Sequence, residues 1–161
     1  MNPRVSELIN LLELEPHVGG GYIREIFRST NLVHLTGNQV ERRALTTIYY
    51  LLGAGEYDSW HRVDSDEVWH YHEGDTLELF WIEQGEEKYT RCLIGEIEYL
   101  SRPAAVVPGG CWQMARTTGE YTLMGCTMGP GFEYEGYQQL RDDPEKASEI
   151  QRRFPELAEF L

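Results

Sequence analysis

The sequence predicts an all-β sandwich or barrel that is flanked by a helical segment at each end. Short segments rich in β-branched and aromatic residues follow one another from residue 22 to residue 128, as in folds built from many strands. Apolar residues recur at helical spacing near the two ends of the chain. The length of 161 residues is ordinary for one domain, and Gly and Pro are scattered between the segments instead of being pooled in a linker. One domain over residues 1–161 is therefore expected.

Both ends of the chain are predicted to be helical. In residues 1–20, apolar side chains recur at helical spacing over Ser6–Glu13, and His17 with three glycines follows this stretch. In residues 136–161 the helical pattern begins at Pro144 and ends in an apolar C-terminus. These helices are expected to flank the barrel.

The barrel itself is predicted over residues 21–135. Turn-forming residues separate its short apolar segments. The expected strands are Tyr22–Arg28, Leu45–Leu52, Trp60–Val63, Glu67–His72, Leu77–Ile82, Tyr89–Ile97, Ala104–Val107, Trp112–Arg116 and Tyr121–Met128.

Charge and composition argue against several classes of partner. The formal net charge of -13 would repel phosphate backbones and anionic lipid, so no nucleic acid and no membrane partner is expected. The apolar runs are shorter than the roughly 20 residues that cross a bilayer, and a cytoplasmic location is predicted. Cys92, Cys111 and Cys126 lie far apart, without the Cys-x-x-Cys spacing of a zinc clip, and are expected to be reduced packing residues.

One stretch of the chain combines a histidine, a carboxylate and two glycines. Gly55, His61, Glu67 and Gly74 are separated by five, five and six residues, and Val63 stands two residues after the histidine. Further along, Pro108–Gln113 contains a Pro-x-Gly turn followed by a glutamine.

These two motifs resemble those of the cupin superfamily. The first has a second histidine where this chain has Val63, and the second has a histidine where this chain has Gln113. The chain is most similar to the DUF985 (cupin 5) family of predicted sugar epimerase-like proteins, in which sequences like Gly20–Tyr22, Ser59–Arg62 and Gly110–Gln113 occur. The resemblance implies a double-stranded β-helix, or jelly-roll barrel, with flanking helices.

Strand alternation then assigns faces to several side chains. If Glu67 faces the interior, as the resemblance implies, Trp69 and Tyr71 face inward with it, whereas His70 and His72 face outward. A metal cluster that includes the last two histidines is thereby disfavoured, since metal ligands must converge on one point. The aromatic pair is interpreted either as ligand-contacting or as ordinary core.

His61 is the main candidate catalytic residue. Alternation places it on the same face as Val63, close to Glu67, and a neighbouring carboxylate favours the imidazolium form and orients the ring. The pair is expected to work as acid or base with Glu67 as orienting group. The alternative is a buried ion pair that only fixes the hairpin.

Substrate-binding roles are predicted for three further side chains. Tyr22 and Arg24 share one face of their strand, and a guanidinium with a phenol hydroxyl suits a polar or sugar-like ligand. Gln113 should point inward beside His61, and its amide suits hydrogen bonding to a substrate more than metal ligation. Each could equally fill the barrel or pair with a buried backbone group.

Within the superfamily, retention of the first histidine without the other metal ligands resembles the dTDP-4-dehydrorhamnose 3,5-epimerases, which need no metal. In that comparison His61 matches the base that removes a proton beside a ketone. Tyr71, Tyr22 and Tyr134 are candidates for the acid, and the aspartate that usually partners the base has no recognisable counterpart.

The predicted function is that of a cupin that binds a small polar or carbohydrate-like molecule, as a metal-independent sugar epimerase or isomerase without a cofactor. One alternative is a metal-dependent oxygenase or isomerase in which Gln113 joins His61 and Glu67 as a nonstandard ligand. Another is a binding protein that only holds a small molecule. A homodimer is expected, because exposed sheet edges need to be paired or covered.

Overall fold

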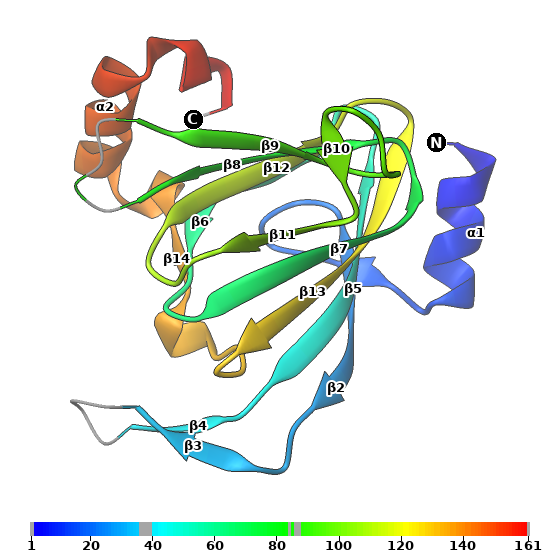
Figure 1. Ribbon diagram of the computed structural model, residues 1–161, viewed down its shortest axis with the longest axis horizontal. Helices are drawn as coiled ribbons and strands as arrows, with labels where there is room; N and C mark the ends of the chain where they lie inside the picture. Colours follow the sequence, from blue (N-terminus) through cyan, green and yellow to red (C-terminus); the bar gives the residue numbers. More distant parts are fainter. Residues whose placement is uncertain (1, 36–39, 84, 86–87, 161) are drawn as a thin grey trace.

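The computed structural model describes residues 2–35, 40–83, 85 and 88–160. Two six-stranded sheets enclose the interior, and a short hairpin and two helices lie outside them (Figure 1). The predicted all-β fold with flanking helices is confirmed.

The first sheet supplies most of the inner surface discussed below. All its neighbouring strands are antiparallel. Their order is β1 (Glu15–Pro16), β2 (Tyr22–Arg28), β5 (Thr46–Gly53), β13 (Tyr121–Gly129), β7 (Asp66–Gly74) and β11 (Ala104–Val107).

The second sheet closes the barrel from the other side. One pair of its strands, at one edge, is parallel and the others are antiparallel. Their order is β10 (Ser101–Arg102), β9 (Thr90–Ile94), β8 (Leu77–Ile82), β12 (Trp112–Thr117), β6 (Tyr57–Arg62) and β14 (Gln138–Gln139).

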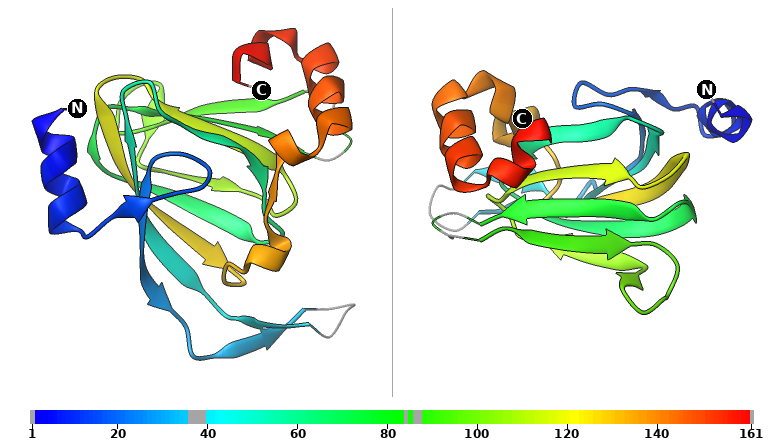
Figure 2. Two further views of the ribbon diagram at one scale, coloured as in Figure 1. Left: turned by 180° about the vertical axis from the view of Figure 1, so that it is seen from behind. Right: turned by 90° about the horizontal axis from the view of Figure 1, so that it is seen from above.

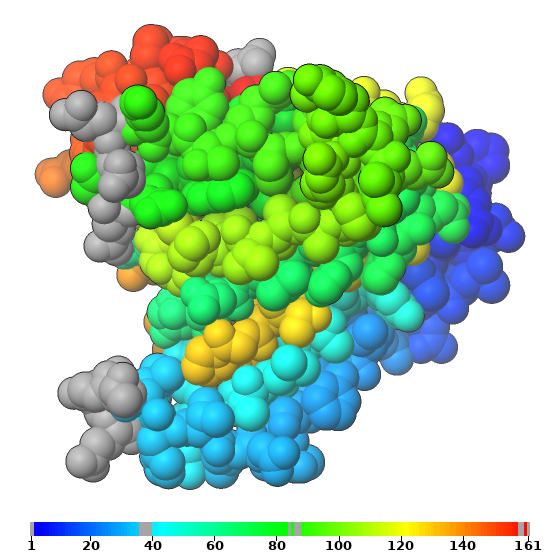
Figure 3. All heavy atoms as spheres, in the orientation of Figure 1, coloured from blue at the N-terminus to red at the C-terminus, as the bar shows by residue number. Residues whose placement is uncertain are grey.

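Each of the nine expected strands overlaps one strand of these sheets. The strands missed by the sequence pattern have two or three residues each, too few for alternation to be visible. Two of them, β1 and β14, lie outside the predicted barrel range of 21–135. The other missed strands are β10 and the hairpin formed by β3 (Leu32–His34) and β4 (Glu41–Arg43), which stands as a separate lobe in the space-filling view (Figure 3).

The N-terminal helix α1 (Pro3–Leu11) begins three residues before the expected position. The side chain of Asn2 accepts a hydrogen bond from the backbone N–H of Arg4 at 2.8 Å, and Pro3 occupies the first helical position, which together form a strong start signal. Val5 and Leu8 are buried against the outer face of the first sheet. Within the described residues no helix is both long enough and apolar enough to cross a membrane.

The C-terminal helix α2 (Pro144–Arg153) starts as expected, with Asp143 as its N-cap. Its buried Ile150 and the following Phe154 cover the outer face of the second sheet, where Trp60 and Trp112 also lie. Two short 3-10 helices, η1 (Tyr134–Gly136) and η2 (Leu140–Asp142), precede it in the chain, and a third, η3 (Pro155–Phe160), follows it. The two α-helices thus lie at opposite ends of the barrel (Figure 2).

Two β-bulges change which side chains face the interior. In β6, His61 pairs with Gln113 and Asp58 pairs with Ala115, so two residues of β6 lie opposite one residue of β12. In strict alternation residues 58 and 61 would lie on opposite faces, and the extra residue places both on the inner face.

The second bulge has the same effect in β2. Glu25 pairs with Ile48 and Phe27 pairs with Thr47, so Ile26 is the extra residue. Glu25 and Arg28 therefore both face the interior, although they are three positions apart.

Candidate functional site

A cavity of about 210 Å³ lies inside the barrel, beside the main hydrophobic core. Its walls come from the inner faces of β2, β5, β6, β7 and β13 and from the loop before β2. A segment after β13, which we call the covering segment (residues 132–137), contributes Phe132, Tyr134 and Tyr137. The walls are mostly apolar, with a small number of polar side chains, as in ordinary small-molecule sites.

His61 lines this cavity together with Val63, as alternation predicted. The imidazole is 5% exposed, and its Nδ1 lies 2.9 Å from the carbonyl oxygen of Ser59. A carbonyl oxygen can only accept, so Nδ1 carries the hydrogen in the neutral ring and Nε2 keeps its lone pair. Burial lowers the pKa of His61, although Glu67 and the Ser59 carbonyl oppose the shift. Nε2 is therefore available as a base near neutral pH.

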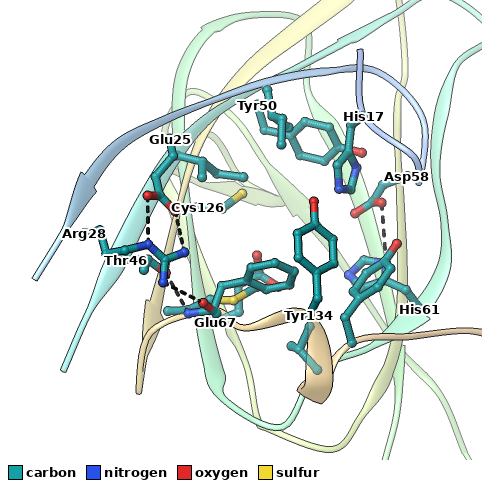
Figure 4. A pocket seen from close by; sticks show the side chains of 16 residues that line it. His17, Glu25, Arg28, Thr46, Tyr50, Asp58, His61, Glu67, Cys126 and Tyr134 are labelled. Atoms are coloured by element: carbon teal, nitrogen blue, oxygen red, sulfur yellow. Dashed lines mark hydrogen bonds and ion pairs between the residues drawn. The ribbon is translucent and has the colours of Figure 1, made fainter. Parts of the chain in front are cut away.

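Asp58 is the carboxyl group nearest to this ring. Its Oδ1 lies 3.4 Å from Nδ1 of His61, the side chain is buried, and Oδ1 makes no hydrogen bond within the described part of the chain (Figure 4). Burial raises the pKa of Asp58 well above its ordinary value, with Tyr50 partly opposing this. The distance is longer than a normal hydrogen bond, as is common in unliganded sites, and would shorten once the ring becomes charged.

Ser59 and Asp58 lie close to Nδ1 of His61, whereas Glu67, the expected orienting group, is held by Gln113. Glu67 lines the cavity, but its Oε2 accepts a hydrogen bond of 2.6 Å from the Gln113 amide. Burial raises the pKa of Glu67 to about 7, opposed by the His61 and Gln113 side chains. Glu67 favours the imidazolium as expected, but burial has the larger effect, so the net shift of the His61 pKa is downward.

Gln113 lies directly behind Glu67. It pairs with His61 across the sheet and is completely buried, so it faces inward as predicted but does not reach the cavity. Its role as a direct substrate ligand is not supported by this position. It acts instead on the cavity wall, by fixing the Glu67 carboxyl.

The two side chains predicted from β2 face the wrong way. Tyr22 packs against the cluster under α1, and Arg24 is exposed and pairs with Glu13 at 2.8 Å. The residues of β2 that line the cavity are instead Ile23, Glu25 and Arg28. Tyr22 and Arg24 do share one face of β2, as alternation requires, but it is the outer face of the sheet.

Trp69 and Tyr71 belong to the core and do not line the cavity. Trp69 is 1% exposed and lies behind Tyr50, with ring centroids 5.9 Å apart. The Tyr71 hydroxyl donates to the carbonyl of Gly74 at 2.5 Å. Trp69 points inward, as predicted. Both rings pack with the core and do not line the cavity.

His70 and His72 lie on the outer face of the first sheet, as predicted. His70 is exposed, and His72 contacts the Tyr49 ring at a centroid distance of 5.9 Å. Neither side chain is near the cavity wall.

A three-ligand transition-metal site does not fit the cavity. Val63 occupies the wall where the superfamily motif has its second histidine, and Gln113 turns its amide nitrogen toward Glu67. Among the described residues no group of three or more His, Cys, Asp or Glu side chains has an arrangement that could hold a metal ion.

Sequence reasoning missed several cavity residues that carry polar groups. Asp58 was hidden by the bulge, because alternation alone puts it on the outer face. His17 comes from the glycine-rich loop before β2, and Tyr137 from the covering segment. Arg28 also lines the cavity, and its position depends on the β2 bulge.

The covering segment is tied to β2 by ion pairs at the cavity wall. Arg28 contacts Glu25 through Nε and Nη2 at 3.0 and 2.8 Å, and Glu133 through Nη1 at 2.9 Å. Nη1 also donates to the carbonyl of Phe132 at 3.1 Å. Figure 4 shows Tyr134 pointing into the cavity between Arg28 and His61. The segment thus closes one side of the cavity through contacts that solvent partly reaches.

The two-sheet barrel and the position of His61 in it define a cupin-type protein. The chain belongs to the cupin superfamily family DUF985, whose family model matches residues 6–140. No curated protein matches the chain.

Solved structures agree with this assignment. Protein SO0799 from Shewanella oneidensis is 31% identical, with a TM-score of 0.74 over 83% of this chain and 82% of that chain. A hypothetical protein from Leishmania major is 30% identical, with a TM-score of 0.78 over 91% of this chain and 96% of that chain.

Oxalate decarboxylase from Bacillus subtilis is a more distant match. It is 16% identical, with a TM-score of 0.59 over 91% of this chain and 36% of that chain. At this identity the similarity shows the shared fold alone.

Proposed function

We propose that this protein is a metal-independent acid–base enzyme that moves a proton beside a carbonyl group in a small carbohydrate-like molecule, as an epimerase or isomerase. The observation that supports the proposal best is the Asp58–His61 pair in an enclosed cavity, with Nδ1 of the imidazole 2.9 Å from the Ser59 carbonyl oxygen and 3.4 Å from Asp58 Oδ1. Nε2 is then the proton acceptor, and Asp58 stabilises the charged ring during the reaction.

The charges of the cavity favour an uncharged ligand. Asp58, Glu67 and Glu25 place carboxyl groups in its wall, and Arg28 is the one arginine or lysine among the described lining residues. The donors of that guanidinium are already used by two carboxylates and a carbonyl oxygen. A phosphate or carboxylate on the ligand would find no free cation and would be repelled.

Three arginines elsewhere in the barrel do not change this conclusion. Arg24 pairs with Glu13 on the outer face, Arg62 lies over the Trp112 ring at 5.1 Å, and Arg116 pairs with Glu78 at 2.6 Å. None of them lines the cavity. The volume of about 210 Å³ also lies below the roughly 300–1,000 Å³ of drug-sized sites.

Tyr134 is the best placed candidate for the acid that returns the proton. Of the three tyrosines considered from the sequence, it lines the cavity, whereas Tyr22 and Tyr71 do not. Tyr137 also lines it, with its ring 5.5 Å from the His61 ring, and burial raises the pKa of this second phenol to about 12.

The test is deuterium wash-in. The purified protein is incubated in D₂O with a panel of uncharged keto and aldo sugars, and incorporation at the carbon next to the carbonyl is followed by NMR. We expect exchange with the wild type, its loss in His61→Asn, and a reduction of about 10²-fold or more in Asp58→Asn, on the scale of general acid–base effects. Equal exchange by the wild type and His61→Asn would contradict the proposal.

A binding protein without catalysis is the second candidate, and the mostly apolar cavity wall favours it. In that case native mass spectrometry of freshly purified protein should show a retained small molecule, and the deuterium experiment should show no exchange. The homodimer also stays a prediction, which light scattering in solution tests.

A further inference from the structure

His17 brings a second imidazole into the cavity from outside the strands. It precedes the loop Gly19–Gly21, which is docked on β6 by a hydrogen bond of 2.7 Å from the Ser59 N–H to the Gly19 carbonyl. A Cβ at position 19 would lie 2.9 Å from Asp58 Oδ1 and 3.1 Å from the His17 ring. The absence of a side chain there lets the ring of His17 approach the Asp58–His61 pair.

The two cavity histidines have opposite hydrogen-bonding roles. Nδ1 of His17 accepts a hydrogen bond of 3.3 Å from the Gly19 N–H, so the hydrogen of its neutral ring is on Nε2. Nδ1 of His61 faces the Ser59 carbonyl, so its hydrogen is on Nδ1. The cavity therefore contains one imidazole that can donate from Nε2 and one that can accept at Nε2.

Aromatic rings fix the position of the donor. The His17 ring contacts Tyr50 edge-on at a centroid distance of 5.8 Å and Tyr137 at 6.3 Å. Within the described part of the chain, the ring hydrogen bond with a defined distance is the one at Nδ1. The Gly20 carbonyl also lies near the ring, where it raises the pKa of His17, and it accepts from the Tyr50 hydroxyl at 2.9 Å. The Nε2–H is the donor that can serve a ligand.

Both imidazoles are neutral near pH 7. Burial lowers the pKa of His17 to about 4, with the charge of His61 acting in the same direction and the Gly20 carbonyl opposing it. Burial also lowers the pKa of His61. Protonation of the first ring would place a second cation beside the ring that has to accept a proton, so neutral His17 suits the chemistry.

We propose that His17 is a second catalytic residue, whose Nε2–H donates a hydrogen bond to the carbonyl oxygen of a small uncharged α-hydroxy ketone or aldehyde while His61 acts on the adjacent carbon. The inference rests on the proposed function, and it adds the donor and the substrate class. A neutral imidazole that polarises a carbonyl is a known solution to this chemistry.

The step is balanced without any co-reactant. The C–H bond next to the carbonyl breaks, the proton goes to Nε2 of His61, and the electron pair forms a C=C bond as the carbonyl oxygen becomes an enolate oxygen. His17 Nε2–H stabilises that oxygen, where charge develops. Return of a proton to the opposite face of the same carbon epimerises it. Return of a proton to the former carbonyl carbon isomerises the molecule, with the hydroxyl proton of the adjacent carbon moving to the enolate oxygen as the new C=O bond forms.

The first experiment needs no ligand. Selective ¹⁵N labelling of histidine, with His17→Phe and His61→Asn used for assignment, reports which ring nitrogen carries hydrogen at pH 7.5. We expect Nε2–H for His17 and Nδ1–H for His61. An Nδ1–H tautomer or a charged ring at His17 would overturn the inference.

The second experiment uses [2-¹³C]dihydroxyacetone as probe. Infrared difference spectra of the bound probe should show a lowered C=O stretching frequency in the wild type and in His61→Asn, and its loss in His17→Phe. Deuterium exchange should fall about 10²-fold in His17→Phe, the scale for loss of one donor to a developing oxyanion, with partial recovery in His17→Gln. His72→Phe, a matched change on the outer face, should leave both signals unchanged.

The outcomes separate the two proposals. Exchange by the wild type with an unchanged carbonyl band and rate in His17→Phe would overturn the role of His17 and leave that of His61 in place. Absence of probe binding and of exchange in the wild type would overturn this substrate class and the inference with it. Exchange that survives in His61→Asn would overturn the proposed function itself.

Discussion

Glu67→Gln is expected to remove a pH dependence of stability that burial of this carboxyl creates. The pKa of Glu67 is about 7 in the folded protein and 4.5 in an exposed chain. Between these values the unfolded chain has released the proton and the folded protein has kept it, so the free energy of unfolding falls as the pH rises. Each pH unit contributes about 1.4 kcal/mol, which gives a loss of about 3 kcal/mol between pH 4.5 and pH 7 and no further loss above it.

The substitution preserves the local geometry. A glutamine at position 67 can turn its carbonyl oxygen toward the Gln113 amide and keep the hydrogen bond that now measures 2.6 Å. It cannot ionise, so its contribution to stability is the same at every pH. The unfolding free energy of the variant minus that of the wild type should therefore rise by about 3 kcal/mol from pH 4.5 to pH 8.

Urea denaturation at half-unit pH intervals measures this difference, with the slope on denaturant concentration as a check on two-state unfolding. Asp58 and the cavity histidines are present in both proteins, so the difference reports the Glu67 carboxyl together with its coupling to His61 and Asp58. Glu98→Gln, which changes an exposed carboxylate, should show a flat difference. A flat difference for Glu67→Gln would refute the reasoning, because it would mean that the buried carboxyl ionises as an exposed one does.

Three further predictions concern the elements around the cavity. Leu8→Ala removes a buried contact of α1 and should lower the free energy of unfolding, measured by urea denaturation, by about 2–4 kcal/mol. Leu11 on the same helix is exposed, and Leu11→Ala should lower it by less than about 0.5 kcal/mol. Gly20→Ala should strongly lower the melting temperature, because the new Cβ would lie 2.1 Å from the backbone oxygen of Tyr57 and the φ of +115° is unfavourable for alanine. Gly55→Ala, with open space around the new Cβ, should lower the free energy of unfolding by only about 1 kcal/mol. Arg28→Gln should lower the free energy of unfolding by no more than about 1 kcal/mol, since the ion pairs of Arg28 are partly exposed. It should nevertheless speed amide hydrogen exchange in the covering segment. Unchanged exchange there would show that the Arg28–Glu133 ion pair does not hold this segment.

The longer strands of the barrel could be predicted because β-branched, aromatic and other apolar residues gather in short runs between turn-forming residues. Leu77–Ile82 is such a case, and its predicted bounds are those of β8. The inward direction of His61 and Val63 followed from strand alternation. A period of two is a property of the backbone, so it can be read wherever the backbone is regular.

The rest of the site could not be predicted, for two physical reasons. Asp58 reaches the cavity through a bulge, and no residue type in β6 marks where one strand gains a residue over its partner. His17 and Tyr137 come from segments before and after the long strands, and their approach depends on how those segments pack. Tyr22 and Arg24 were misassigned because alternation relates residues to each other but does not say which of the two faces is the inner one.

The bulge in β6 also bears on how such a protein could change over evolutionary time. Deletion of one residue between Asp58 and His61 would leave these two residues two positions apart, the spacing at which a regular strand puts both side chains on the same face. The strand would lose its irregularity, pair regularly with β12 and keep the aspartate and the histidine on the inner side. A relative with Asp-x-His in place of Asp-x-x-His could therefore present the same two side chains to its cavity without a bulge.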